Sequence, residues 1–384
     1  MIDDLRTLRQ QPDNFMKAIY LTNPAGPESL VSGEIPRPVP AAGEVLVKVH
    51  ATAVTPTEFQ WYPTFHTPVG EPRLFPIVPG HEFSGVIEAT GPGVTEWQPG
   101  EPVYGLNDWF AGGALAEYCV APVTGLAMKP RLLDYTQAAV APISALTAWQ
   151  GLLERAHLQS GERVLIHGAA GGVGMFAVQL ARWRGAHVIA TASAANLDFV
   201  RRLGAQEVID YRAARFEDVA RAVDVVFDGV GGETLERSWP VLAKNGRLVT
   251  VATASAGAAE ARVREAFLLV RADGAQLAQL AALIDAGELR VFAEAVFPLA
   301  QARQAYARAR QGGMRGKIAL RVNGEPLGRK LQTSKFNLQE NFKPQPSSGH
   351  AGCKFEASLV LPELVSITGR QAKVEGEGRW QSEE

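Results

Sequence analysis

A glycine-rich stretch near the middle of the chain, RVLIHGAAGGVGMFAVQLARWRGAHVIA over residues 163–190, has the residue types and spacing of a phosphate-binding site. Ala169, Gly171 and Gly174 occupy the fixed positions of the G-x-G-x-x-G fingerprint, with alanine replacing the first glycine. Small residues let the backbone approach a pyrophosphate, and the start of the following helix directs N–H groups and partial positive charge toward it. Since an apolar run precedes the turn and a helical pattern follows it, the stretch predicts a dinucleotide site rather than a turn without a ligand. Further cofactor contacts are expected from Gly172, Val173 and Val251.

The choice of cofactor depends on the residues after the second strand of this unit. A protein that prefers NAD usually places Asp or Glu there, where it binds the ribose hydroxyls. Residues 190–195 read ATASAA, and the first acid is Asp198. A 2′-phosphate would meet no repulsion here, so NADPH is favoured, with Thr191 and Ser193 as hydrogen-bond donors. Three nearby cations could pair with the phosphate: Arg201, Arg202 and Arg212. Each of them alone is more often a solvated surface charge.

The elements around the turn predict a parallel sheet. Short apolar runs alternate with helical patterns along this part of the chain, at residues 163–167, 187–190, 207–210, 224–228 and 247–251. Such alternation implies crossover connections and a sheet that is covered on both faces. The sequence therefore predicts an α/β fold for this half of the chain.

The remaining segments have a different texture. Most of the 24 prolines lie at or before Pro142, among glycines and short runs such as residues 45–54, which predicts an irregular, mostly-β domain. A helical segment at 274–286 leads to AVFPLA, to a helix rich in Ala and Arg, and to the strand GKIALRV; we expect these last elements to rejoin the first domain. Residues 1–15 are interpreted as an extension, and the polar stretch beyond Pro326 as an accessory tail without a catalytic role.

Composition favours a small-molecule partner. A net charge of -2, with Lys and Arg scattered among acids, provides no bulk attraction to nucleic acid or to an anionic membrane. The apolar stretches are too short for a spanning helix, and the polar start does not resemble a signal peptide. Cys119 and Cys353 are too few for a disulfide framework, which fits a cytoplasmic protein.

Several motifs, in this order along the chain, resemble the medium-chain dehydrogenase/reductase superfamily: GHEFSGVIEATGPGVTEWQPGEPVYGL, AAGGVG, DGVGG, NGRLVTVA and GKIAL. The resemblance implies a GroES-like catalytic domain at 16–140, completed by 293–324, a Rossmann domain at 141–292 and a tail at 325–384. It also implies a substrate cleft between the two domains and a homodimer. Tyr211 matches a tyrosine beside the 2′-phosphate in NADPH-dependent quinone reductases. Asn196 stands where these proteins have a lysine that helps to bind this phosphate.

The resemblance extends to both zinc-dependent and zinc-free enzymes, and the residues favour the second group. A catalytic zinc takes three protein ligands, commonly Cys, His and a second Cys or an acid. His81 and Glu82 match part of this pattern, but the cysteine positions fall at Thr55 and near Ile143. Residues 106–117 contain no cysteine for a structural zinc either. We therefore expect no metal, and we expect His81 to support its turn through a hydrogen bond.

Without a Lewis acid, the expected reaction is hydride transfer from NADPH to a quinone or an α,β-unsaturated carbonyl. Candidate catalytic residues are Thr55 and Thr147, which could bind a carbonyl oxygen or the cofactor, and Tyr62, which could donate a proton or stack on a ring. Other residues expected near the cleft are Thr57, Glu58, Trp61, Phe65 and Phe75. The aromatic residues among them could form a wall of the cleft or belong to the ordinary hydrophobic core. An enoyl reductase acting on acyl thioesters and a nucleotide-binding protein without turnover remain alternatives.

Overall fold

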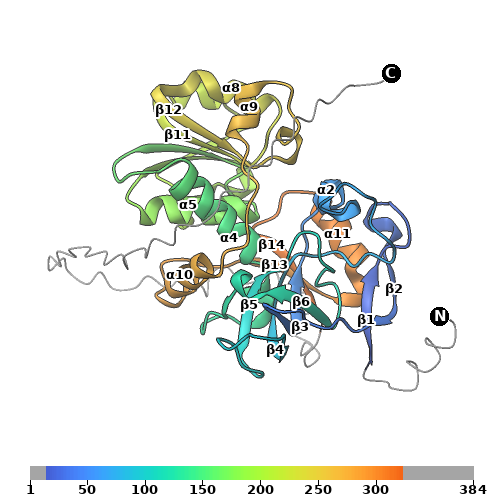
Figure 1. Ribbon diagram of the computed structural model, residues 1–384. Coiled ribbons are helices and arrows are strands. Elements are labelled where there is room, and N and C mark those ends of the chain that lie inside the picture. Colours follow the sequence, from blue (N-terminus) through green and yellow to red (C-terminus); the bar gives the residue numbers. More distant parts are fainter. Residues whose placement is uncertain (1–13, 323–384) are drawn as a thin grey trace, which may run out of the picture. The chain divides into compact units, whose positions relative to one another are not determined.

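The computed structural model describes residues 14–322, which belong to one compact unit of the chain. One half contains five parallel strands in the order β10-β9-β8-β11-β12 (Figure 1). Their bounds are β8 (Arg163–His167), β9 (His187–Ala192), β10 (Glu207–Asp210), β11 (Val223–Asp228) and β12 (Leu242–Thr250). All five lie where the apolar runs predicted strands, and the largest difference is at β12, which begins five residues earlier than expected. The α/β fold with a doubly wound parallel sheet is thus confirmed.

Helices lie on both sides of this sheet (Figure 1). They are α5 (Gly172–Trp183), α6 (Leu197–Leu203), α7 (Phe216–Val219), α8 (Glu233–Ser238) and α9 (Ala261–Ala266), with short 3-10 turns η6 (Ala194–Asn196), η7 (Trp239–Val241) and η8 (Thr253–Ser255). Apolar residues of α7, α8 and α9 pack in one core cluster with inward residues of all five strands. Gly185 follows α5 at φ +84°, a conformation that glycine adopts without strain.

The other half contains a mostly antiparallel sheet in the order β13-β14-β3-β4-β5-β7, with β6 paired to β3. The strands are β3 (Glu44–Ala53), β4 (Glu82–Thr90), β5 (Pro102–Leu106), β6 (Tyr118–Pro122), β7 (Leu126–Met128), β13 (Ala293–Pro298) and β14 (Lys317–Arg321). β14 pairs with β3, with Ala319 opposite Ala53, so the end of the described chain completes a sheet begun by its early residues.

A separate two-stranded sheet, β1 (Phe15–Tyr20) and β2 (Val31–Pro36), lies beside α11 (Ala302–Arg310) (Figure 1). Residues of β1 and α11 share a core cluster around the buried Tyr306. The remaining short elements of this half are η2 (Pro27–Ser29), η3 (Glu58–Gln60), α2 (Tyr62–Phe65), η4 (Val123–Gly125), α3 (Tyr135–Ala139) and η9 (Leu299–Gln301).

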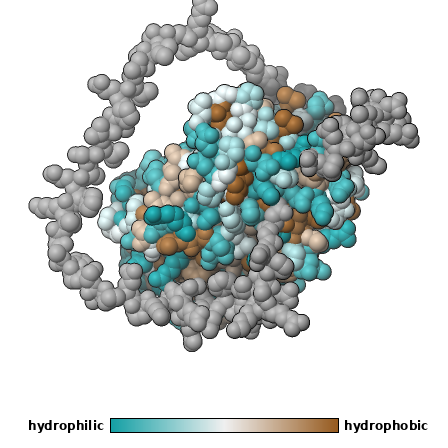
Figure 2. Space-filling view, turned by 90° about the horizontal axis from the view of Figure 1, so that it is seen from below, coloured by the Kyte–Doolittle hydropathy of each residue, from teal (hydrophilic) through white to brown (hydrophobic). Residues whose placement is uncertain are grey.

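Two further helices complete the described part. α4 (Pro142–Trp149) continues into a wider π-helical turn, η5 (Gln150–Arg155), and packs against α5. α10 (Gly274–Asp285) occupies the segment predicted as a helix, and the Asp273 side chain caps its first turn. None of the helices described between residues 14 and 322 has the length and apolarity that crossing a bilayer requires. On the face in Figure 2, apolar residues form small separate patches among hydrophilic ones. The predicted tail and Cys353 lie outside the described residues.

Candidate functional site

The glycine-rich turn lies where the direction of chain winding reverses. β8 is the central strand; the chain continues to β9 and β10 on one side and later to β11 and β12 on the other. In open parallel sheets, ligands bind at the carboxyl ends of the strands at such a switch point. The loops after β8 and β11 lie side by side here, because a Cβ atom added at Gly168 would come 3.4 Å from the Val230 side chain.

Each glycine of the turn has a distinct geometric role. Gly168, which the fingerprint did not single out, has φ +71°, so it is the residue that turns the chain. A Cβ at Gly174 would come 2.2 Å from the Gly168 carbonyl oxygen, so this glycine permits close packing of helix on strand. Gly171, Gly172 and Val173 are partly exposed at the start of α5, where residues 174–181 are buried. The bare helix start is therefore open to a phosphate group.

A buried carboxylate organises the neighbouring loop. Asp228, at the end of β11, accepts hydrogen bonds from the backbone N–H groups of Val230 and Gly231 and from the Thr250 hydroxyl. The Val251 N–H donates to the Asp228 carbonyl at 2.9 Å. These bonds fix the two loops that follow β11 and β12 beside the glycine turn, and they place Val251 at this edge of the sheet.

Thr191 differs from its predicted role. It is buried, and its Oγ1 lies 3.0 Å from Nδ1 of His167. Burial lowers the pKa of His167 to about 4, so the ring is neutral at pH 7 and carries one N–H. The Ser238 hydroxyl donates to the Thr234 carbonyl and so accepts from His167 Nε2, which leaves Nδ1 as the acceptor from Thr191. The Thr191 hydroxyl proton is thus used inside the protein and is not a donor for a 2′-phosphate.

Ser193 and Tyr211 lie together at the adjacent ends of β9 and β10. Ser193 is partly exposed before η6, and the Tyr211 N–H bonds to the Ala192 carbonyl at 3.3 Å. The Tyr211 ring is 54% exposed, with the Arg212 guanidinium 5.5 Å from its centroid. Arg201 instead pairs with Asp198. This edge therefore presents the Ser193 hydroxyl, the Tyr211 phenol and the Arg212 guanidinium.

A residue that the sequence did not single out also reaches this loop. Arg315, which precedes β14, donates from Nε to Asn196 Oδ1 at 2.8 Å and from Nη2 to the Ala195 carbonyl at 2.5 Å. The only local signal was its position before GKIAL. No periodicity could have indicated its contact with a loop about 120 residues earlier in the chain.

The three predicted catalytic residues have unequal support. Thr55 follows β3, and its buried hydroxyl has no hydrogen-bond partner within residues 14–322, so its hydrogen-bonding capacity is unused there. The Thr147 hydroxyl instead donates to the Ile143 carbonyl at 2.6 Å. Tyr62 is 54% exposed and stacks on His66 with ring centroids 4.4 Å apart. Thr147 can therefore only accept a hydrogen bond from a ligand, and Tyr62 faces largely onto solvent.

Two buried carboxyl groups near Thr55 form a polar cluster in the half with the mostly antiparallel sheet, the predicted catalytic half. The Glu58 N–H bonds to the Thr55 carbonyl, and the Glu58 carboxyl accepts from the Gly80 N–H at 3.1 Å and from the Tyr306 hydroxyl. Burial raises the pKa of Glu58 to about 7, against the opposing effect of these bonds. Glu58 thus joins the turn before His81 to α11.

Glu82 holds the second carboxyl of this cluster. It is fully buried, forms an ion pair with the Lys317 ammonium and accepts the Ile143 N–H at 3.0 Å. Burial raises the pKa of the Glu82 carboxyl, and the Lys317 charge opposes that effect. Gly316, the residue before Lys317, donates its backbone N–H to the Ala170 carbonyl at 2.9 Å, so the cluster is adjacent to the nucleotide turn.

The residues at the zinc positions do not fit a metal ion. His81 Nδ1 lies 3.1 Å from Asn107 Oδ1, as expected for a histidine that supports its turn, and the Trp61 and Trp109 rings lie near the imidazole. Both oxygens of Glu82 are already engaged, while Thr55 and Ile143 supply no thiolate. Across the described part of the chain, no group of three His, Cys, Asp or Glu side chains could hold a metal.

The predicted aromatic wall is only partly present. Trp61 packs edge-on against Trp109 at 5.2 Å between centroids, a partner that the sequence did not suggest. Phe65 and Phe75 instead pack on the core cluster around Tyr306. For these two residues the packing supports the second of the two expected alternatives, ordinary core.

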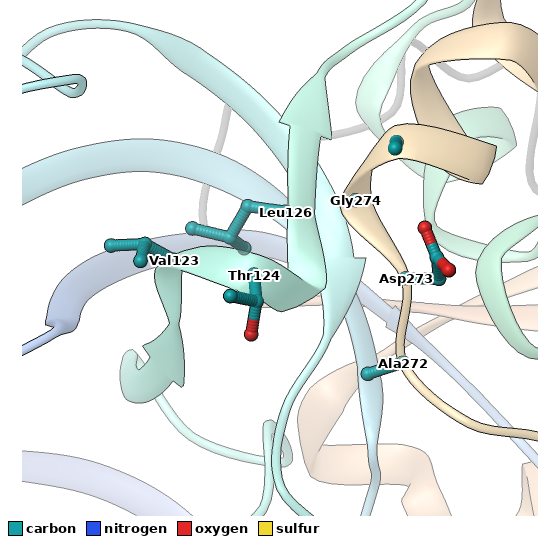
Figure 3. Close-up of a pocket in the computed structure, with 7 residues that line it drawn as sticks. Val123, Thr124, Leu126, Ala272, Asp273 and Gly274 are labelled. Atoms are coloured by element: carbon teal, nitrogen blue, oxygen red, sulfur yellow. The ribbon is translucent and has the colours of Figure 1, made fainter. Parts of the chain in front are cut away.

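A surface pocket of about 410 Å³ lies elsewhere in the structure (Figure 3). It is lined by residues at η4, β7 and the start of α10, namely Val123, Thr124, Leu126, Ala272, Asp273, Gly274 and Ala275. None of them belongs to the glycine turn or to the polar cluster, and Asp273 already caps α10. We assign the candidate site to the switch point, where the glycine turn and the polar cluster meet, and not to this pocket.

Comparison with known proteins shows similarity to a family of oxidoreductases. Residues 41–131 match the family described as alcohol dehydrogenase GroES-like domain, and residues 203–320 match the family described as zinc-binding dehydrogenase. The mitochondrial NAD(P)H oxidoreductase RTN4IP1 of Mus musculus is 32% identical over 325 residues, which cover 73% of this chain and 82% of the relative.

Solved structures agree with these matches. The quinone oxidoreductase from Coxiella burnetii has a TM-score of 0.74 and 31% identity, covering 80% of this chain and 100% of its own. The CurK enoyl reductase has a TM-score of 0.70 and 27% identity, covering 81% and 100%. The chain therefore belongs to the medium-chain dehydrogenase/reductase superfamily of oxidoreductases, as its motifs indicated.

Proposed function

We propose that this protein uses NADPH, without a metal ion, to reduce a quinone or an α,β-unsaturated carbonyl. The observation that carries the proposal is the pairing of an open glycine turn with a β9 end that bears no acid before Asp198. Similar proteins named NAD(P)H oxidoreductase and quinone oxidoreductase support the nicotinamide cofactor and the substrate class.

The chain's own residues would bind and orient the reactants. The backbone of Gly171, Gly172 and Val173 would hold the pyrophosphate, and Ser193 with Tyr211 would contact the 2′-phosphate. The Thr55 hydroxyl, which has no partner in the described residues, would donate a hydrogen bond to the carbonyl oxygen of the substrate. When bound, NADPH supplies the hydride, which the protein positions and shields from water.

The proton that completes the reduction needs a second donor. Tyr62 remains the proposed proton donor, and because its ring is half-exposed, its hydroxyl can regain a proton from solvent. Thr147 is retained in a weaker role, as an acceptor that orients the bound reactants. A homodimer and a cytoplasmic location stay predictions; the similar RTN4IP1 protein is named as mitochondrial.

An enoyl reductase acting on acyl thioesters is the second candidate. The observation that favours it is the likeness to CurK enoyl reductase, whose 0.70 TM-score is close to that of the quinone oxidoreductase. Both activities use the same fold and the same hydride donor, so they differ only in the acceptor.

NADPH oxidation measured across quinones, enones, enoyl thioesters of pantetheine and aldehydes distinguishes these candidates. We expect turnover with quinones or enones and little with aldehydes. Faster turnover of enoyl thioesters would favour the second candidate, and NADPH binding without turnover of any acceptor would contradict both.

The cofactor preference is tested by Ser193→Asp. A carboxylate at this position would repel the 2′-phosphate and offer an acceptor to the ribose of NADH, so NADPH affinity should fall at least about tenfold while NADH affinity holds or rises. Ser193→Ala, which removes the donor without adding charge, is the matched control and should lose less. Ala192→Asp would not be a suitable parallel test, because Ala192 is buried in β9. A wild-type protein that already prefers NADH would refute the proposed cofactor.

A further inference from the structure

Arg315 is held against the nucleotide loop by bonds from two sides. Its Nε and Nη2 atoms donate to Asn196 Oδ1 and to the Ala195 carbonyl, and its backbone N–H donates to a Glu294 carboxylate oxygen at 2.5 Å. Asn196 is itself buried, so its amide oxygen is a fixed anchor for the guanidinium. The cation therefore has a defined place beside the loop that follows β9, unlike a solvated arginine on a flexible stem.

The residues after Arg315 connect this place to the glycine turn. Gly316 pairs with Gly171 in a parallel bridge and donates to the Ala170 carbonyl at 2.9 Å. Residues 315 and 316 thus connect the loop after β9 to the proposed pyrophosphate site. A dinucleotide spans the same two places, because its adenosine ribose lies toward the end of the second strand.

The charges around Arg315 leave its guanidinium suited to an anion. Glu294, the acid bonded to its backbone, is paired through its other oxygen with Arg308. A guanidinium has five N–H donors, and the two bonds to Ala195 and Asn196 go to neutral oxygens, so the positive charge is not cancelled by the loop.

We propose that Arg315 is the cation that determines specificity for the 2′-phosphate of NADPH, and that Ser193 and Tyr211 add hydrogen bonds from uncharged side chains. This inference rests on the proposed NADPH preference and adds to it a residue from the returning C-terminal segment. The guanidinium can donate two N–H bonds to a phosphate in a fork, and its fixed position reduces the entropy lost on binding.

The test is titration calorimetry of the full chain with 2′,5′-ADP and with 5′-AMP, two fragments that differ by the 2′-phosphate alone. Arg315→Met should weaken 2′,5′-ADP at least about tenfold, the expected loss of a charge-assisted bond, while 5′-AMP affinity stays within about twofold. Asn196→Asp is an independent variant, nearly isosteric, whose carboxylate would pair with Arg315; it should weaken 2′,5′-ADP in the same direction. Arg310→Met, which removes an arginine of the same segment that pairs with Glu28, should change neither affinity.

Each outcome has one meaning. If wild type prefers 2′,5′-ADP and both Arg315→Met and Asn196→Asp keep that preference, the role of Arg315 is refuted while the NADPH proposal stands. Equal losses for both fragments in these two variants would show that Arg315 only supports the loop, which also refutes the inference. If wild type binds the two fragments equally, the NADPH proposal fails and the inference fails with it. Should Arg315→Met not fold, Arg315→Gln, which also removes the charge, is measured with the same two fragments and decides.

Discussion

The glycine turn and the polar cluster of the catalytic half are adjacent in space but differ in how the chain builds them. The turn is contiguous: Gly168 to Gly174 follow one strand and begin one helix. The cluster is assembled from Glu58 after β3, Glu82 at the start of β4 and Lys317 at the start of β14. A site of the first kind can be recognised from spacing, whereas a site of the second kind exists only once the sheet has formed.

The two regions also use different physical devices. The turn works through absent side chains, since missing Cβ atoms leave backbone N–H groups accessible and allow α5 to approach β8. The cluster works through buried charge, which is tolerated only because Lys317 pairs with Glu82 and hydrogen bonds satisfy the carboxyl oxygens. Changes in the cluster should therefore affect stability most, and changes in the turn should affect cofactor binding most.

Removal of the Lys317 charge should have the largest effect. The two side chains are 7% and 0% exposed, so Lys317→Met leaves a buried carboxylate unpaired. We expect the free energy of unfolding at pH 7 to fall by about 3–5 kcal/mol, measured by urea denaturation. The double variant Lys317→Met/Glu82→Gln should recover most of this loss, and Lys244→Met on the exposed surface should change stability by less than about 0.5 kcal/mol. A single variant as stable as wild type would show that the ion pair contributes nothing.

The pH dependence of stability should be the next largest effect. The folded pKa of Glu58 is about 7, above its usual value of 4.5, so folding favours the protonated form. The contribution is fully present below pH 4.5 and is lost as the pH rises through 7, a change of about 3 kcal/mol. The difference in unfolding free energy between wild type and Glu58→Gln should fall by this amount from pH 4.5 to 8.

Other groups change their protonation state in the same range, and the difference measurement removes them. His81 and His167 have folded pKa values near 4, so their contribution has the opposite sign, but it is common to wild type and variant. The amide that Glu58→Gln introduces can keep the Gly80 bond through its oxygen, and the Tyr306 hydroxyl can rotate to accept from its nitrogen. A difference that stays constant with pH would mean that Glu58 titrates normally.

Two glycines of the turn separate packing from cofactor binding. Gly174→Ala places a methyl group 2.2 Å from the Gly168 carbonyl oxygen and should destabilise the fold by about 1–3 kcal/mol. Gly171 has φ -75°, and its Cβ would meet only an ordinary contact at 3.4 Å. Gly171→Ala should therefore keep wild-type stability within about 0.5 kcal/mol and yet bind NADPH about tenfold more weakly, as measured by thermal unfolding and fluorescence titration. Full NADPH affinity in Gly171→Ala would place the pyrophosphate elsewhere.

Metal removal should have no effect. Purified protein should contain no stoichiometric zinc, and dialysis against a chelator should leave the rate of NADPH oxidation unchanged, because Glu82 is occupied by Lys317 and the cysteine positions of the zinc pattern fall at Thr55 and near Ile143. One tightly held zinc per chain, detected by mass spectrometry, would contradict the assignment of these residues.

The sequence could predict the elements whose signals are local. β8 and β10 coincide with the predicted runs, and the Gly171 and Gly174 spacing indicated the start of α5. The order of the strands and the pairing of β14 with β3 lack a local signal; only the return of the last elements to the first domain was expected. The sequence left the roles of Phe65 and Phe75 open between cleft and core, because an aromatic residue suits both equally well; their packing on the core cluster favours the second.

The nucleotide turn, the parallel sheet and the lack of cysteine ligands for zinc could thus be predicted from the residues alone, because each depends on residue types at short spacing. The tertiary structure decided which polar groups have partners. It showed that the Thr191 proton is used by His167 whereas the Thr55 hydroxyl has no partner in the described chain, and it brought Arg315 to Asn196. Hydrogen bonds and ion pairs between distant segments depend on distances of a few ångströms, which only the packed chain defines.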